Sequence, residues 1–188
     1  IKHLKGNIFT LMWGFLPEFG MVLTGGIPKL IVMAEFTGDT LEDVEARMKI
    51  AHEDMLQFGL KMNMTKDENE TSKYWTLRRE SFNLLRSKLH GHRTAPFIDD
   101  IVVNPDLLPE FLPKLQALFS HYPLVYTIAG HVGNGNFHII PLMDLSQDES
   151  VTIIKELGTK VFDLVKEYKG SITGEHNDGL IRTAFLNK

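Results

Sequence analysis

The sequence contains no cysteine among its 188 residues. This absence excludes a disulfide framework, a thiolate nucleophile and a cysteine-ligated iron–sulfur cluster within the chain. It is consistent with a reducing compartment, where disulfides are rare. A strong excess of charge of either sign is also lacking, because the net charge is −4 and the isoelectric point is near 6.1. We therefore expect no nucleic-acid partner.

Long hydrophobic runs are lacking too, since no apolar stretch approaches the roughly 20 residues that cross a bilayer. The hydrophobic fraction of 43% is nevertheless sufficient for the core of one domain. Glycines and prolines are scattered among bulky apolar residues in 1–29, and we expect an irregular segment there. We expect residues 30–188 to form the domain proper. Because the first residue is Ile1 rather than Met, we expect a fragment of a larger protein.

The apolar pattern over the rest of the chain predicts an α+β fold. A first helix is expected between Thr40, as N-cap, and Gly59. From residue 97 onward, strands and helices follow in the order β-α-β-β-α-β, which is typical of a ferredoxin-like (split βαβ) antiparallel sheet with helices on one face. The expected strands are 30–36, 97–103, 124–130, 137–142 and 171–173, and the other expected helices are about 73–88, 106–120 and 147–168, with a polar loop at 64–73.

A tight hairpin is predicted at Asn134-Gly135, between two of these strands. Asn-Gly favours a type I′ turn, in which both central residues have positive φ. Counting outward from that turn places His131 opposite His138, with Cβ atoms roughly 4.5–5.5 Å apart. Two imidazoles at this separation can share one metal ion. The hairpin therefore predicts two of the ligands of a metal site.

A third ligand is expected from the adjacent residues Glu175 and His176. In an extended segment their side chains point to opposite sides, so one could complete the metal site while the other acts separately. A carboxylate with two neutral imidazoles forms an open divalent site with room for water or substrate. A histidine beside such a site is suited to general-base catalysis, since its unperturbed pKa is about 6.5.

Simpler interpretations exist for each of these features. The two hairpin histidines could be polar surface residues, and Glu175 and His176 could lie at a solvated strand end. Gly133-Asn-Gly-Asn136 could be a phosphate-binding loop, although no helix N-terminus or lysine follows it. Arg78 could be a surface charge that pairs with Glu80 or Asp67.

Two motifs together resemble the C-terminal domain of FAD-linked oxidases. These are His131-Val-Gly-Asn-Gly-Asn-Phe-His138 and, after a helix, Gly174-Glu-His176. Trp75-Thr-Leu-Arg78 and Phe97-Ile-Asp-Asp-Ile-Val-Val103 resemble the tryptophan/arginine helix motif and the following strand of that family. The resemblance covers about residues 30–188. The family includes D-lactate dehydrogenase, the glycolate oxidase flavin subunit and D-2-hydroxyglutarate dehydrogenase.

The resemblance implies an FAD-linked oxidation of a D-2-hydroxy acid to the 2-oxo acid. His131, His138 and Glu175 would bind a divalent metal, Zn or Mn. His176 would remove the hydroxyl proton, and Arg78 would bind the substrate carboxylate through its planar guanidinium. FAD would be bound mainly by a preceding domain of the parent chain, so the fragment alone would be inactive.

The resemblance also implies a location and partners for the parent protein. It would act in the cytoplasm or peripherally on the inner membrane. An iron–sulfur module would accept its electrons, and it would form a homo-oligomer.

Two residues depart from the family pattern. Asn134 stands where the family usually has Asp, and Ile98-Asp99 stands where some members have a lysine. The exact hydroxy acid is therefore open.

The alternative function is a ferredoxin-like regulatory or metal-binding domain without catalysis of its own.

Overall fold

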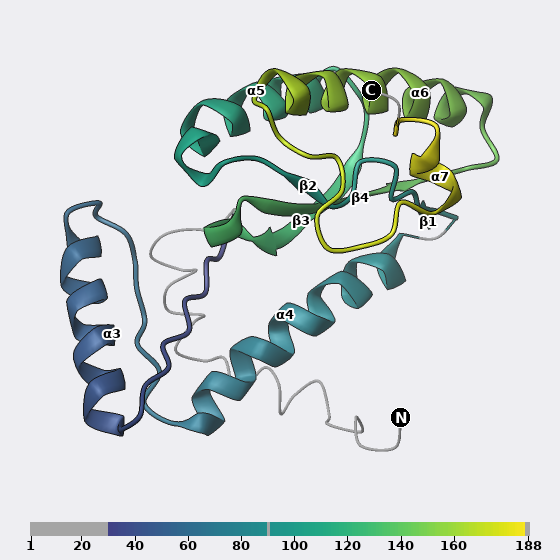
Figure 1. Ribbon diagram of the computed structural model, residues 1–188. Helices are drawn as coiled ribbons and strands as arrows, with labels where there is room; N and C mark the ends of the chain where they lie inside the picture. The colour runs from purple at the N-terminus through teal and green to yellow at the C-terminus, as the bar shows by residue number, and fades with distance from the viewer. Residues whose placement is uncertain (1–29, 90, 187–188) are drawn as a thin grey trace. The chain divides into compact units, whose positions relative to one another are not determined.

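The computed structural model describes residues 30–89 and 91–186, with residues 77 and 80–88 described in their backbone only. The expected irregular segment 1–29 lies outside these residues. The chain divides into two units, Ile1–Met64 and Thr65–Lys188. The sheet, the helices that cover it and the candidate site all belong to the second unit (Figure 1).

The described part of the first unit contains one helix, α3 (Leu41–Leu56). The Thr40 hydroxyl accepts the backbone N–H of Asp43 at 3.2 Å, so the predicted N-cap is confirmed. The helix ends earlier than predicted, with Gln57 as C-cap, and Gly59 follows two residues later with a left-handed φ of +62°. The strand predicted at 30–36 is wrong, because no strand forms there and Val32 is 67% exposed. An apolar run becomes a strand only where a second strand can pair its backbone groups.

The second unit begins with α4 (Glu68–Lys88), which is longer than predicted. The Asp67 carboxylate accepts the backbone N–H of Glu70 at 2.8 Å and starts the helix inside the segment expected to be a loop. The remaining elements are β1 (Arg93–Thr94), β2 (Ile101–Val102), η1 (Pro105–Leu107), α5 (Leu108–Ser120), β3 (Val125–His131), η2 (Val132–Asn134), β4 (Asn136–Met143), α6 (Asp148–Glu167) and α7 (Gly179–Thr183).

The sheet is built around β4, and all its pairings are antiparallel. β3 runs along one edge of β4, whereas β1 and β2 pair with opposite ends of the other edge. Beyond β2, Ser171 makes a single antiparallel bridge to Val102. The strands expected at 97–103 and 171–173 are therefore much shorter than predicted, and β1 lies where no strand was predicted.

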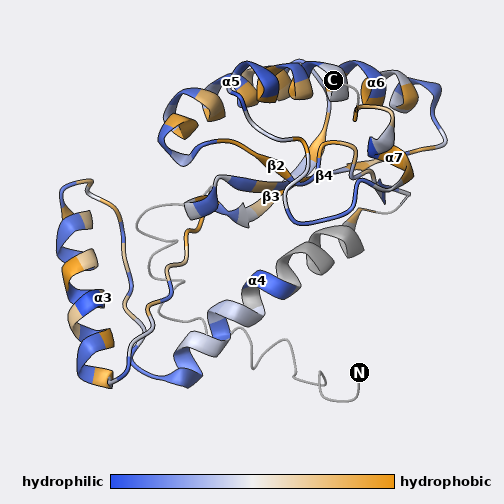
Figure 2. Ribbon diagram, viewed as in Figure 1, coloured by the Kyte–Doolittle hydropathy of each residue, from blue (hydrophilic) through white to orange (hydrophobic). Residues whose placement is uncertain are grey.

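Helices α5 and α6 cover one face of this sheet (Figure 1), and their apolar sides turn toward it (Figure 2). Alternate residues of β4 form the sheet side of the core, among them the fully buried Ile139. Burying one such side chain contributes about 1.5–3 kcal/mol. The largest fully buried side chains are Phe97, Phe111, Phe162, Ile98, Ile101, Leu115, Ile139, Leu142, Leu157, Val103, Val161 and Val165.

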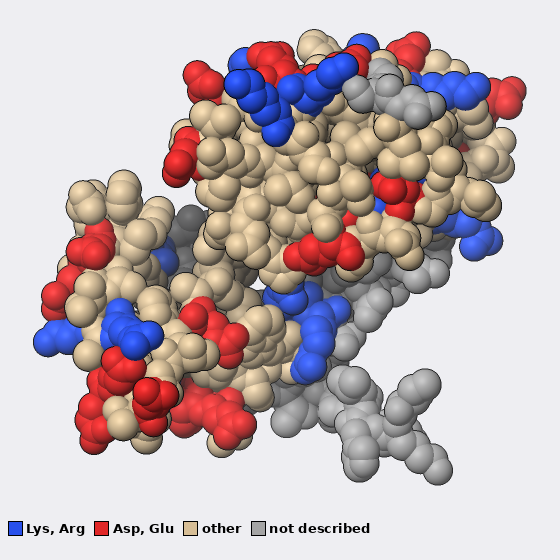
Figure 3. Space-filling model, in the orientation of Figure 1, with Lys and Arg blue, Asp and Glu red and all other residues tan. Residues whose placement is uncertain are grey.

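The outer surface of the helical layer carries charges of both signs. Figure 3 shows acidic and basic side chains interspersed over α5 and α6. One ion pair joins the two helices, between Lys114 Nζ and Glu167 Oε1 at 3.0 Å. None of the described helices is long and apolar enough to cross a membrane.

The α+β class and the antiparallel sheet are thus confirmed. The expected placement of the helices on one face is also observed. The ferredoxin-like topology stays a prediction, because its first and last strands are represented by a two-residue strand and a single bridge. The second face of the sheet carries alternate residues of β3 and β4, and the candidate site lies on it.

Candidate metal centre and active site

The hairpin between β3 and β4 brings His131 and His138 together, but in a different register from the one predicted. His131 pairs with Asn136 and Ala129 pairs with His138, so the two histidines are diagonal rather than opposed. The pairing is shifted by two residues, and an even shift keeps both side chains on one face of the sheet. Their ring centroids are 6.0 Å apart.

The turn itself explains the shift. Four residues form it instead of two: η2 is followed by Gly135 at φ +65°, whereas Asn134 does not have positive φ. The predicted type I′ turn is therefore wrong. A Cβ on Gly135 would lie 1.7 Å from the carbonyl oxygen of Val103, and the N–H of Val103 donates to the Gly135 carbonyl at 3.0 Å. Tertiary contact with the end of β2 has overridden the local turn preference.

Glu175 completes a cluster of three metal-ligating side chains with the two histidines. Its Oε2 lies 3.6 Å from His131 Nε2 and 3.8 Å from His138 Nε2, and the three donor atoms all lie within 4.8 Å of one another. An ion about 2.1 Å from each donor requires donor separations of about 3.0–3.6 Å. Small side-chain movements would therefore let one divalent ion contact all three residues.

The donor set is accessible and chemically suited to such an ion. The side chains of His131 and Glu175 are 47% and 42% exposed, whereas that of His138 is only 15% exposed. Two imidazole nitrogens and one carboxylate oxygen suit Zn²⁺ and also tolerate Mn²⁺. The exposed side of the cluster leaves room for water or an oxygen ligand.

A buried carboxylate, that of Asp100, shapes the loop that carries Glu175. Asp100 is fully buried and accepts three consecutive backbone N–H groups, those of Gly174, Glu175 and His176, at 2.9–3.1 Å. The side-chain amide of Asn136 donates to it at 2.9 Å. Burial by itself would raise the pKa of the Asp100 carboxyl, but these hydrogen bonds outweigh it and hold this pKa well below its usual range.

Gly174 allows this loop to approach the buried carboxylate. A Cβ at this position would lie 2.6 Å from Asn136 Nδ2, 2.7 Å from Val102 Cγ2 and 3.0 Å from Asp100 Oδ1. Glycine is therefore required by the close packing and not by a turn. The position next to Glu175 is thus fixed by contacts with the sheet.

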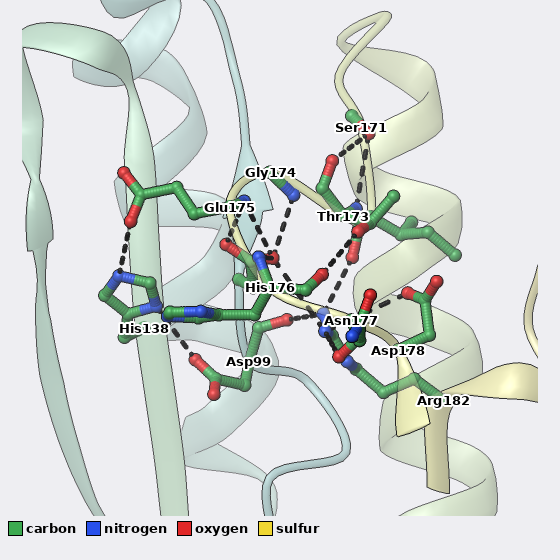
Figure 4. Close-up of polar contacts among 12 residues, drawn as sticks. Asp99, His138, Ser171, Thr173, Gly174, Glu175, His176, Asn177, Asp178 and Arg182 are labelled. Carbon is green, nitrogen blue, oxygen red and sulfur yellow. Dashed lines mark hydrogen bonds and ion pairs between the residues drawn. The ribbon is translucent and has the colours of Figure 1, made fainter. Parts of the chain in front are cut away.

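Arg182, from α7, holds the other side of the loop and is only 3% exposed. Its guanidinium donates to the backbone carbonyls of Asp99, Ile172 and Asn177 (Figure 4). It also lies 3.8 Å from the Asp100 carboxylate, so the two buried charges compensate each other. Asp100 and Arg182 together fix the segment from which Glu175 and His176 project.

His176 lies beside the cluster without belonging to it. Its ring centroid is 5.1 Å from that of His138 at a 39° tilt, and the residue is exposed. The segment is bent rather than extended, so both Glu175 and His176 reach the surroundings of His138 (Figure 4). An accessible imidazole beside a metal site can accept a proton from a bound substrate.

Over residues 28–188 the sequence matches the family described as FAD linked oxidases, C-terminal domain. The chain belongs to this family. The match extends over both histidine motifs and confirms the resemblance that they suggested.

Curated relatives of this FAD-linked oxidase domain are longer proteins. D-2-hydroxyglutarate dehydrogenase of Pseudomonas putida is 30% identical over 154 residues, which cover 80% of the chain and 15% of the relative. Glycolate oxidase subunit GlcD of Escherichia coli K12 is 28% identical over 152 residues, covering 79% and 29%. The probable mitochondrial D-lactate dehydrogenase of Danio rerio is 26% identical over 122 residues, covering 65% and 24%. The chain thus spans between 15% and 29% of the length of these relatives.

The remaining predicted site residue of this domain, Arg78, lies on α4. It is exposed, and its guanidinium carbon lies 5.5 Å from the centre of the Trp75 ring. Trp75 thus gives the guanidinium a flat surface beside it. The structure therefore brings together four of the five predicted residues, and the role of Arg78 stays a prediction.

Sequence reasoning missed the three residues that support the cluster: Asp99, Asp100 and Arg182. The signal for the first two was present, since two adjacent carboxylates interrupt the apolar stretch 97–103. Charged residues at core positions are rarely buried without partners. Arg182 had no comparable signal, because its role depends on three backbone carbonyls that only the fold brings together.

Proposed function

We propose that this chain is the substrate- and metal-binding part of an FAD-dependent oxidoreductase that converts a D-2-hydroxy acid to the 2-oxo acid. The single observation that carries the proposal is the convergence of His131, His138 and Glu175, with the tilted ring of His176 beside that of His138. The family match and the names of the relatives supply the redox class. Lactate, glycolate and 2-hydroxyglutarate are the candidate substrates.

Each residue has a separate task in this proposal. His131, His138 and Glu175 hold the divalent ion, and Arg78 binds the substrate carboxylate through paired hydrogen bonds. When bound, the ion would supply Lewis acidity at the substrate hydroxyl, and FAD, held mainly by a domain outside this chain, would take the hydride from Cα. His176 receives the hydroxyl proton on a ring nitrogen. One hydride and one proton leave the hydroxy acid, and the product is the 2-oxo acid.

The sheet supports a split βαβ topology for this domain. The neighbours across it are Ser171, β2, β4 and β3, and every pairing is antiparallel. This is the spatial order expected when two βαβ halves interlock through a central hairpin. The hairpin that joins the halves is then the one that carries the two histidine ligands.

The experiment is anaerobic mixing of the full-length parent protein with D-lactate, L-lactate, glycolate and D-2-hydroxyglutarate, each in turn. We expect the visible absorbance of the flavin to disappear with at least one D-acid or glycolate, with one 2-oxo acid formed per flavin reduced. L-lactate should leave it unchanged. A parent that contains no flavin, or whose flavin no 2-hydroxy acid reduces, would instead support the regulatory or metal-binding alternative.

A further inference from the structure

His138 is held from two sides by carboxylates of different residues. Its Nδ1 lies 3.1 Å from Asp99 Oδ1, whereas its Nε2 faces Glu175 Oε2 at 3.8 Å. The first distance is that of a hydrogen bond, and the second leaves space for an ion. Figure 4 shows Asp99 and Glu175 on opposite sides of the imidazole.

Asp99 is itself rigidly placed. The residues on either side of it, Ile98 and Asp100, are fully buried. Its backbone carbonyl accepts a hydrogen bond from buried Arg182, and its side chain is only 19% exposed. A carboxylate held in this way loses little conformational entropy when it forms its hydrogen bond to the ring.

This contact decides which nitrogen of His138 can bind a metal. A carboxylate accepts hydrogen bonds only, so Nδ1 must carry the proton that it donates to Asp99. In the neutral ring Nε2 then has the free lone pair, and Nε2 is the atom that faces Glu175. His131 lacks this support, because Glu175 is its only carboxylate partner among the described residues.

We propose that Asp99 is a positioning residue that fixes the Nδ1–H tautomer of His138 and aims Nε2 into the His131–His138–Glu175 cluster. The inference rests on the metal-binding part of the proposed function. A carboxylate behind a ligating histidine both orients the ring and strengthens it as a ligand, and its loss lowers metal affinity by about 10–100-fold. Asp99 acts through His138 and needs no contact with substrate.

The test combines two measurements on the chain. The first is the tautomer of His138 in the metal-free protein, from the ¹⁵N shifts of its ring nitrogens at about pH 9. The second is a calorimetric titration with Zn²⁺. Both are made on the wild type, on Asp99→Asn and Asp99→Ala, and on the matched control Asp106→Asn, which removes an exposed carboxylate.

We expect the Nδ1–H tautomer in the wild type and the control, and a mixture of tautomers in both Asp99 variants. Zn²⁺ affinity should fall by about 10–100-fold in the variants and stay unchanged in the control. A wild-type ring protonated on Nε2, or Zn²⁺ affinities that Asp99→Asn does not change, would overturn the role of Asp99. A wild type that binds no Zn²⁺ while showing the Nδ1–H tautomer would instead overturn the metal site and leave the orientation of His138 by Asp99 standing. If Asp99→Ala does not fold, the wild-type tautomer and the two measurements on Asp99→Asn still test the role of Asp99.

Discussion

The backbone N–H of His176 donates to the carboxylate of Asp100 at 2.9 Å. The two preceding residues donate to the same carboxylate, so one buried anion fixes the backbone of the Gly174–His176 segment. The side chains of Glu175 and His176 are then directed toward His138 from a fixed backbone. The geometry of the candidate site therefore depends on a residue that contacts none of its ligand atoms in the described structure.

Asp100→Asn should destabilise the fold by about 3 kcal/mol. The amide keeps only one acceptor oxygen, and it removes one of the two carboxylates, those of Asp100 and Asp178, that compensate the buried guanidinium of Arg182. Urea unfolding of the wild type and the variant measures the difference in free energy of unfolding. Asp106→Asn, an exposed position, is the control and should change it by less than about 0.5 kcal/mol.

The same carboxylate should make the free energy of unfolding depend on pH in the acid range. The pKa of Asp100 is lowered in the folded chain below the value of about 3.9 that an unfolded Asp has. Its contribution is therefore present above about pH 5 and is lost as the pH falls from there toward the folded pKa. Between pH 5 and pH 3, the stability of the wild type should fall more steeply than that of Asp100→Asn. Parallel curves would show that Asp100 is not held as an anion.

Gly135→Ala should destabilise the hairpin, because position 135 combines a left-handed φ with contact against the Val103 carbonyl. The strain and the overlap together should cost about 2 kcal/mol or more. Gly133→Ala is the matched control, since a Cβ there meets no atom within 4 Å. Thermal unfolding should separate the two variants, and equal melting temperatures would contradict the role of Gly135.

The sequence was sufficient to predict the α+β class, the helices α5 and α6 and the four residues that meet at the site. It misplaced the pairing of the hairpin, because local turn preference favoured Asn134-Gly135 while the contact of Gly135 with Val103 produced a four-residue turn. The error did not separate the histidines, since a shift of two residues keeps the same face of the sheet.

The contacts that the supporting residues make could not be predicted in the same way. Asp99 and Asp100 are adjacent in sequence, yet one carboxylate contacts His138 and the other the Gly174–His176 segment. This division depends on the positive φ of +66° at Asp100, which an apolar strand pattern does not indicate. The strand expected at 97–103 was shortened by the same irregularity.

His176→Asn should abolish substrate oxidation in the full-length parent while leaving metal affinity unchanged. The amide keeps a polar group in place, but it cannot accept a proton at neutral pH. Turnover with a 2-hydroxy acid and Zn²⁺ affinity are measured on the same preparations. His121→Asn, at an exposed position at the end of α5, is the control. A variant that retains wild-type turnover would remove His176 as the base.

The metal affinity of His131→Ala tests the candidate site most directly. Calorimetric titration with Zn²⁺ and Mn²⁺ should give one ion per wild-type chain for at least one of the two metals. In His131→Ala the affinity for that metal should fall by more than about 100-fold, beyond the ~10–100-fold effect of losing a supporting residue. His121→Ala should bind as the wild type does. A wild-type chain that binds neither ion, or a His131→Ala chain that binds as tightly as the wild type, would contradict the metal centre formed by His131, His138 and Glu175.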